Sequence, residues 1–167
     1  IADRHDVFLL DAFGVLNIGE TAIPGVVDRI AALKAQNKTV LVVSNAAGFP
    51  HSALVAKYRR LGYDFAPEAV ITSRATLLSA IGEMTNAHWG LMATRSTGLA
   101  DLEQLTLSYL EEDAAPYAEV DGFLLVGSAA WTEQRQALLE QALLNTPRPV
   151  WVANPDIVAP RDVGFSV

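Results

Sequence analysis

The feature that most constrains the fold is a regular alternation of short apolar runs with amphipathic segments. It predicts a strand at Val7–Leu10, a helix that Pro24 introduces and that closes near Asn37, a strand at Thr39–Val43, and a helix from Ser52 to Leu61. The first run is continuous, which indicates a strand buried on both faces. Strands that alternate with helices at this spacing form βαβ units, so we predict an α/β fold with a Rossmann-like parallel sheet.

The alternation restarts further along the chain. It predicts four strands, at Ala69–Ser73, Trp89–Ala93, Gly122–Val126 and Val150–Ala153. It also predicts helices at Arg74–Met84 and Thr132–Leu144, the second with Thr132 as its cap. Leu99–Leu107 is expected to be a mixed stretch, and Pro116–Val120 a polar connection. One βα series therefore ends and a second begins between residues 73 and 88. We expect two domains, with residues 1–80 in the first and residues 81–167 in the second.

Composition excludes several classes of function. Of the 167 residues, 51% are hydrophobic and 19% are charged, which suits folded domains with a proper core. A net charge of -7 argues against a broad nucleic-acid surface, because phosphate backbones require clustered Lys and Arg. No apolar run approaches the roughly 20 residues that span a bilayer, and nothing resembles a signal peptide, so we expect a cytoplasmic protein without membrane contact. The absence of Cys leaves oxygen ligands for any metal ion.

Polar residues follow the first two predicted strands. Asp11 comes directly after Leu10, and Ser44 and Asn45 follow the strand that ends at Val43. Ligand sites in parallel sheets lie at the carboxyl ends of strands, so these side chains should face one crevice. A carboxylate there can bind Mg²⁺ and attack phosphorus, while a hydroxyl and an amide can donate to phosphoryl oxygens. Each motif also has a plainer interpretation, as a turn, a helix cap or a polar loop.

Taken in order, these motifs resemble the haloacid dehalogenase superfamily, and within it the class IIA branch of sugar-phosphate, nucleotide and p-nitrophenyl phosphatases. The resemblance covers nearly the whole chain and rests on Asp11-x-x-Gly14-Val15-Leu16, Pro24-Gly25, Ser44-Asn45, Leu61-Gly62, Ile71-Thr72-Ser73, Asp121-Gly122 before Val126-Gly127, and Ala153-Asn154-Pro155-Asp156. Class IIA members insert an α/β cap after the second motif. That position agrees with this chain, because one helix and one strand nearly fill the interval between Asp11 and Ser44.

The resemblance implies a magnesium-dependent phosphohydrolase that acts on a small phosphorylated metabolite through an aspartyl-phosphate. Asp11 would be the nucleophile and a metal ligand, and the backbone carbonyl of Phe13 would be a second metal ligand. The phosphate would be held by Ser44, Asn45 and Gly14. The resemblance also assigns Asn154, Asp156 and Arg161 to the cap, and it implies that a homodimer could form.

Two departures from the family pattern leave alternatives open. Family phosphatases carry a second Asp two positions after the nucleophile, where it protonates the leaving group, and this chain has Phe13 there. The later family motifs, which supply a Lys and a further Asp, are not found in these residues. Because the chain starts at Ile1 and ends at Val167, we expect a fragment whose C-terminal core segment is absent. The alternatives are a weak or inactive relative that binds a phosphorylated ligand or a protein partner, and a haloacid dehalogenase.

Other candidate sites are weaker. The three His residues are scattered and have no Cys nearby, so a zinc site is not expected. Lys57, Arg59 and Arg60 form a short basic cluster on a predicted helix, which we interpret as a solvated face.

Overall fold

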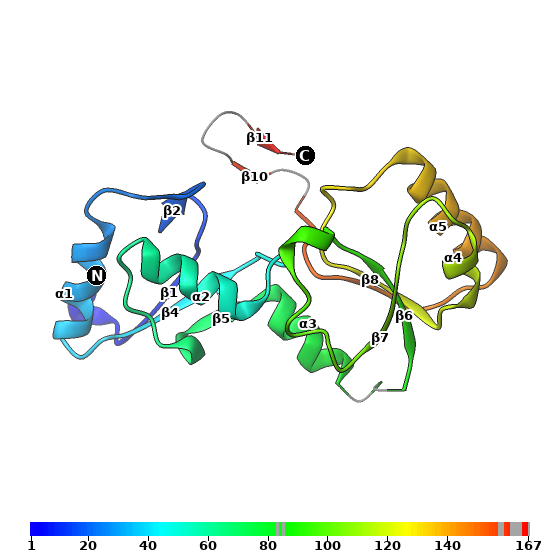
Figure 1. The fold of residues 1–167 in the computed structure, drawn as a ribbon. Coiled ribbons are helices and arrows are strands. Elements are labelled where there is room, and N and C mark those ends of the chain that lie inside the picture. Colours follow the sequence, from blue (N-terminus) through cyan, green and yellow to red (C-terminus); the bar gives the residue numbers. More distant parts are fainter. Residues whose placement is uncertain (83, 85, 157–158, 161–164, 167) are drawn as a thin grey trace. The chain divides into compact units, whose positions relative to one another are not determined.

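A computed structural model describes residues 1–82, 84, 86–156, 159–160 and 165–166. It confirms the α/β class with parallel sheets, and the chain divides into two compact units (Figure 1). Unit 1 contains Ile1–Asn45, His51–Thr72 and Asp156–Val167, and unit 2 contains Ala46–Pro50 and Ser73–Pro155. The expected bounds, 1–80 and 81–167, differ from these units: residues 73–80 fall in unit 2, where Leu77 packs into the core, and Asp156 falls in unit 1.

The sheet of unit 1 has parallel strands in the order β1-β4-β5. Its strands are β1 (Val7–Leu10), β4 (Thr39–Ser44) and β5 (Val70–Thr72), and they are connected by α1 (Val26–Ala35) and α2 (His51–Arg60). The described part of the unit also contains the β2–β3 hairpin (Asn17–Ile18 and Thr21–Ala22), the 3₁₀ turns η1 (Ala2–Arg4) and η2 (Pro67–Ala69), and the paired strands β10 (Ala159–Pro160) and β11 (Phe165–Ser166).

The bounds of α1 follow from its flanking residues. Gly25 has a φ of 78°, a left-handed conformation that glycine adopts at little cost, and it lets the chain turn into the helix after Pro24. Asn37, with a φ of 57°, takes the left-handed conformation after the helix ends. The predicted helix between Pro24 and Asn37 is therefore confirmed.

The helices of unit 1 cover one face of its sheet. Parallel crossovers are right-handed, and both crossovers step in the same direction across the sheet, so α1 and α2 lie on the same side. Side chains on that face are buried, and those of Val40, Val42 and Val70 are at most 4% exposed. The other face is apolar and open: Val7, Leu9, Val43 and Ile71 are 55%, 65%, 42% and 40% exposed.

The prediction that Val7–Leu10 is buried on both faces is therefore wrong for the described structure. Phe8 and Leu10 face the helices and are partly buried, whereas Val7 and Leu9 project from the open face. Among the described residues, nothing packs over that face closely enough to bury these side chains.

Unit 2 contains a second parallel sheet, in the order β7-β6-β8-β9. Its elements are α3 (Ser73–Ile81), β6 (His88–Met92), η3 (Arg95–Thr97), β7 (Thr106–Tyr109), α4 (Ala115–Glu119), β8 (Gly122–Leu125), α5 (Glu133–Asn145) and β9 (Val150–Val152). Its two buried clusters are centred on Trp89 and Phe123. Strand β8 starts at a glycine because a Cβ at Gly122 would lie 2.5 Å from the Trp89 ring.

In the second half of the chain, one prediction is wrong and another is confirmed. The stretch Pro116–Val120 is not a polar connection: most of it belongs to α4, which starts at Ala115, has Pro116 in its first turn and buries Tyr117. The expected cap of α5 is confirmed, since the Thr132 hydroxyl accepts a hydrogen bond of 3.2 Å from the Arg135 amide. Within the part of the chain that the structure describes, no helix is both long and apolar enough to cross a membrane.

Candidate active site

The carboxyl ends of β1 and β4 lie side by side in unit 1. Leu10 at the end of β1 pairs with Val42, and Ser44 ends β4 opposite Thr72 of β5. Asp11 is the next residue after Leu10, so its carboxylate and the Ser44 hydroxyl belong to the same edge of the sheet. The sequence predicted this arrangement from strand order alone.

The backbone after Asp11 forms a compact turn. The Asp11 carboxylate accepts a hydrogen bond of 2.7 Å from the Ala12 amide, and the Ala12 carbonyl accepts hydrogen bonds from the amides of Leu16 and Asn17. Gly14 adopts a φ of 75°, and its amide donates to the Asn17 carbonyl at 2.9 Å. The Asp11 side chain is exposed, so it is not buried in the apolar core.

Tyr58 of α2 contacts Ser44, and sequence reasoning did not identify it. Its side chain is buried at 2% exposure and is hydrogen-bonded to Ser44, which is itself 3% exposed. Burial raises the pKa of Tyr58, and the negative charge of Asp11 adds to this rise. The phenol is therefore neutral.

Lys57, the residue before Tyr58, contacts Phe13 rather than extending into solvent. Its ammonium lies 5.7 Å from the centre of the Phe13 ring. It also donates to the Gly19 carbonyl at 2.9 Å and to the Glu20 carboxylate at 2.7 Å. The expectation that Lys57 belongs to a solvated basic face is therefore wrong, since its side chain is only 15% exposed.

The other predicted residues are distributed between the two units. Asn45 donates from its amide nitrogen to the Asp156 carboxylate at 3.0 Å, and both residues belong to unit 1. Asp156 thus differs from its expected position in the second domain, whereas the exposed Asn154 falls in unit 2. Arg161 lies outside the described residues. A signal for the Asn45–Asp156 pair is not visible in the sequence, because 111 positions separate the two side chains.

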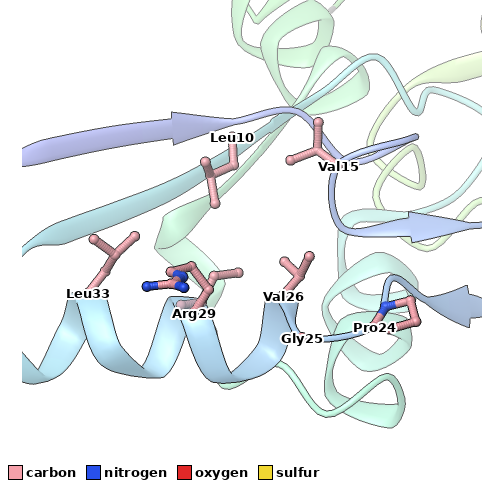
Figure 2. A pocket seen from close by; sticks show the side chains of 8 residues that line it. Leu10, Val15, Pro24, Gly25, Val26, Arg29 and Leu33 are labelled. Atoms are coloured by element: carbon pink, nitrogen blue, oxygen red, sulfur yellow. The ribbon is translucent and has the colours of Figure 1, made fainter. Parts of the chain in front are cut away.

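A groove on the helix side of unit 1 is distinct from these polar residues. It has a volume of about 500 Å³ and is lined by Leu10, Val15, Pro24, Gly25, Val26, Arg29, Ile30 and Leu33. Figure 2 shows Leu10 and Val15 facing Val26 and Leu33 of α1 across it. Its lining is mostly apolar and includes neither Asp11 nor Ser44, so it does not provide the phosphate site.

Comparison with known proteins assigns the family. A family model described as haloacid dehalogenase-like hydrolase matches residues 8–104, which is more than half of the chain. The chain belongs to the haloacid dehalogenase-like hydrolases. The match begins in β1 and includes Asp11, Phe13 and Ser44, so the resemblance that these motifs predicted is confirmed.

Curated relatives of this haloacid dehalogenase-like hydrolase match over short segments. The glycerol-3-phosphate phosphatase of Rattus norvegicus is 39% identical over 66 residues, which is 38% of this chain and 21% of that protein. The human glycerol-3-phosphate phosphatase is 40% identical over 58 residues, covering 35% of this chain and 18% of its own length. The matched segment therefore spans only about a fifth of the curated relatives.

Solved structures match over the whole chain. A protein from Cytophaga hutchinsonii described as a possible sugar phosphatase of the same superfamily has a TM-score of 0.85 at 20% identity, covering 100% of this chain and 61% of that one. A 4-nitrophenylphosphatase from Thermotoga maritima has a TM-score of 0.76 at 22% identity, covering 98% and 60%. The structural likeness establishes the fold, and the relatives agree with the class IIA branch.

The donors at the end of β1 are oxygen atoms, the kind of ligand that hard divalent cations bind. The described residues contain no group of three or more His, Cys, Asp or Glu side chains that could enclose a metal ion. Mg²⁺, however, is commonly held by one or two carboxylates, substrate phosphate and water. The exposed Asp11 carboxylate and the nearby Phe13 carbonyl can supply protein oxygens for that mode of binding. A glycerol phosphate phosphatase from Mycobacterium tuberculosis with the same fold was solved in complex with magnesium.

Proposed function

We propose that this chain forms the nucleophile and phosphate-binding part of a magnesium-dependent phosphohydrolase for a small phosphorylated metabolite. The observation that carries the proposal is the adjacency of Asp11 and Ser44 at neighbouring strand ends, with Tyr58 hydrogen-bonded to Ser44. Family membership supports hydrolysis as the general reaction. The relatives named as glycerol-3-phosphate and 4-nitrophenyl phosphatases support a phosphate monoester as the substrate.

In the proposed reaction, an Asp11 carboxylate oxygen attacks phosphorus and forms an aspartyl-phosphate. The bond from phosphorus to the leaving oxygen breaks, and its electron pair stays with that oxygen. Ser44 donates to a phosphoryl oxygen, and the Gly14 and Asn45 regions line the same edge. Water then attacks phosphorus, releases inorganic phosphate and regenerates the Asp11 carboxylate. Mg²⁺, held by Asp11 and the Phe13 carbonyl, would offset the negative charge of the phosphoryl group.

The test uses Asp11→Asn in the complete protein that carries this chain. The variant should lose turnover and lose an acid-stable phosphoenzyme, because an amide cannot act as the nucleophile. Asp28→Asn is a matched control, since Asp28 is an exposed carboxylate of the first turn of α1. Equal phosphoenzyme in Asp11→Asn and the unmodified protein would refute the assignment of Asp11.

A second candidate function is binding of a phosphorylated ligand or a protein partner with little turnover. Phe13 favours it, because the family's phosphatases have an Asp at this position and a missing general acid costs about 10²- to 10⁴-fold in rate. Phe13→Asp discriminates the two: a large gain in phosphatase rate indicates a decayed enzyme, and a loss indicates that Phe13 suits the native chemistry. Turnover of a halo-acid without magnesium would instead favour a dehalogenase. A cytoplasmic location and a homodimer stay predictions.

A further inference from the structure

The chain enters unit 2 directly after the proposed phosphate-binding residues. Ser44 and Asn45 belong to unit 1, whereas the next five residues, Ala46–Pro50, belong to unit 2. The chain then returns to unit 1 at His51. We call Ala46–Pro50 the docked loop. Because the chain is continuous, contacts that fix the docked loop also restrict the backbone of Asn45.

The docked loop lies at the edge of the unit 2 sheet where ligands usually bind. Strand β6 lies between β7 and β8, so the chain passes from β6 to β7 on one side and then returns to β8 on the other. The carboxyl ends of β6 and β8 form the switch point at which α/β sheets usually bind ligands. A Cβ at Gly127, which follows β8, would lie 3.8 Å from the Gly48 Cα and 3.9 Å from the Thr94 amide nitrogen. The docked loop therefore lies against the ends of both strands.

Two apolar residues anchor the docked loop. Ala47 is 3% exposed and belongs to the buried cluster centred on Trp89, which also contains Val126. Pro50 is buried at the other end of the loop, and its Cγ would lie 3.6 Å from a Cβ at Gly98. Undocking would expose these apolar side chains to water, which is unfavourable, so their burial favours the docked conformation.

Arg74 adds a polar contact to the docked loop. Its side chain is fully buried, and its guanidinium donates to the Asp101 carboxylate at 2.5 Å. The same group donates to the Gly98 carbonyl at 3.3 Å and to the Ala47 carbonyl at 3.4 Å. A planar guanidinium presents several donors in a fixed fork, which the ammonium of a Lys does not reproduce. Because buried polar groups are costly to leave unpaired, the buried Arg74–Ala47 hydrogen bond favours the docked loop.

We propose that Arg74 is a positioning residue that, through the docked loop, fixes Ser44 and Asn45 in the arrangement that binds a phosphoryl group. Arg74 holds Ala47 in unit 2, while within unit 1 Asn45 donates to the Asp156 carboxylate at 3.0 Å. The segment between them is therefore held at both ends. The proposal rests on the phosphohydrolase function proposed above, and it gives unit 2 a role in phosphate affinity.

The expected size of the effect follows from the fraction of molecules in which the loop is docked. A ligand binds more weakly in proportion when only a fraction of the protein is in the binding-competent state. If a variant leaves the loop docked about a tenth of the time, the apparent Kd of phosphate rises about tenfold. Amide hydrogen exchange of the loop accelerates as well, because local opening exposes its backbone to water.

Two variants loosen the docked loop in different ways. Ala47→Gly removes the side chain that enters the core of unit 2, and Arg74→Lys keeps a positive charge beside Asp101 without the planar fork. The matched control is Ala142→Gly, because Ala142 is also buried, at 8% exposure, but belongs to the other cluster of unit 2, centred on Phe123. All variants are made in the complete protein and compared at a temperature where tryptophan fluorescence shows that unit 2 is folded.

The experiment measures amide hydrogen exchange of residues 45–49, and the Kd of inorganic phosphate by isothermal titration with Mg²⁺ present. The exchange rate and the Kd should each rise about tenfold or more in Ala47→Gly and Arg74→Lys, and stay within about twofold in Ala142→Gly. Unchanged exchange in the first two variants overturns the positioning of the loop, and faster exchange with an unchanged Kd overturns its link to the phosphate site.

An equal rise of the Kd in Ala142→Gly also overturns the proposal, since general loosening of unit 2 would then suffice. If the unmodified protein binds no phosphate and Asp11 is never phosphorylated, the proposed phosphohydrolase function fails and the link to phosphate affinity fails with it. Phosphate binding that is equally tight in all variants overturns the link alone and leaves the phosphohydrolase function intact.

Discussion

Replacing Arg74 by Met should destabilise unit 2 by about 3–5 kcal/mol, the usual cost of removing one partner from a buried ion pair. Arg74 is fully buried, and its guanidinium donates to the Asp101 carboxylate at 2.5 Å. The same group reaches the carbonyls of Ala47 at 3.4 Å and Gly98 at 3.3 Å. Met fills most of the volume but leaves Asp101, whose side chain is 24% exposed, without its counter-charge.

Urea denaturation followed by tryptophan fluorescence measures this effect selectively, because the three Trp residues of the chain all belong to unit 2. The midpoint should fall while the slope stays constant, as expected when stability alone changes. Adding Asp101→Asn to Arg74→Met should restore part of the lost stability, since the uncompensated charge is then removed.

The control is Arg95→Met. Arg95 pairs with Glu111 at 3.0 Å, but the two side chains are 61% and 48% exposed, so the expected loss is at most about 1 kcal/mol. The prediction is refuted if Arg74→Met lowers the free energy of unfolding by less than about 1 kcal/mol, or if the two variants lose the same amount. Burial would then not explain the contribution of the Arg74–Asp101 pair.

Three further predictions concern unit 1 and the surface of unit 2. Tyr58→Phe should lower the free energy of unfolding by about 1 kcal/mol and weaken inhibition by inorganic phosphate, because Ser44 loses a hydrogen bond; unchanged phosphate inhibition would contradict this. Leu9→Ser should change stability by less than about 0.5 kcal/mol and reduce self-association in sedimentation, since Leu9 is 65% exposed on the open sheet face. Hydrogen bonding to Arg135 lowers the pKa of Glu112 from 4.5. The contribution of this pair to folding stability is therefore present above pH 4.5 and is lost as pH falls through the lowered pKa. Arg135→Met should remove that part of the acid dependence of unfolding.

Much of unit 1 could be predicted because its signals are local. Apolar runs, Pro24 and a glycine before the helix specify the elements, and strand order then brings Asp11 and Ser44 to one edge. The β2–β3 hairpin was missed because strands of two residues have no measurable periodicity. Helix α4, with five residues, is similarly too short for a periodic pattern that would reveal the buried Tyr117.

The inward orientation of Lys57 could not be predicted either. In the sequence it belongs to a run of basic residues, and its charge alone indicates solvent. Only the fold reveals that Phe13 and the Gly19 carbonyl lie where its ammonium reaches. Likewise, the apolar run at Val7–Leu10 does not reveal that Val7 and Leu9 stay exposed among the described residues.

The most direct test of the central claim is a crystal structure of the complete protein grown with magnesium and beryllium fluoride, which mimics a phosphoryl group on a carboxylate. We predict a beryllium–oxygen bond to Asp11 and a hydrogen bond from the Ser44 hydroxyl to a fluorine. Beryllium fluoride bound to another residue, or bound at Asp11 with Ser44 turned away from it, would contradict the proposal that these two strand ends form one phosphoryl-transfer site.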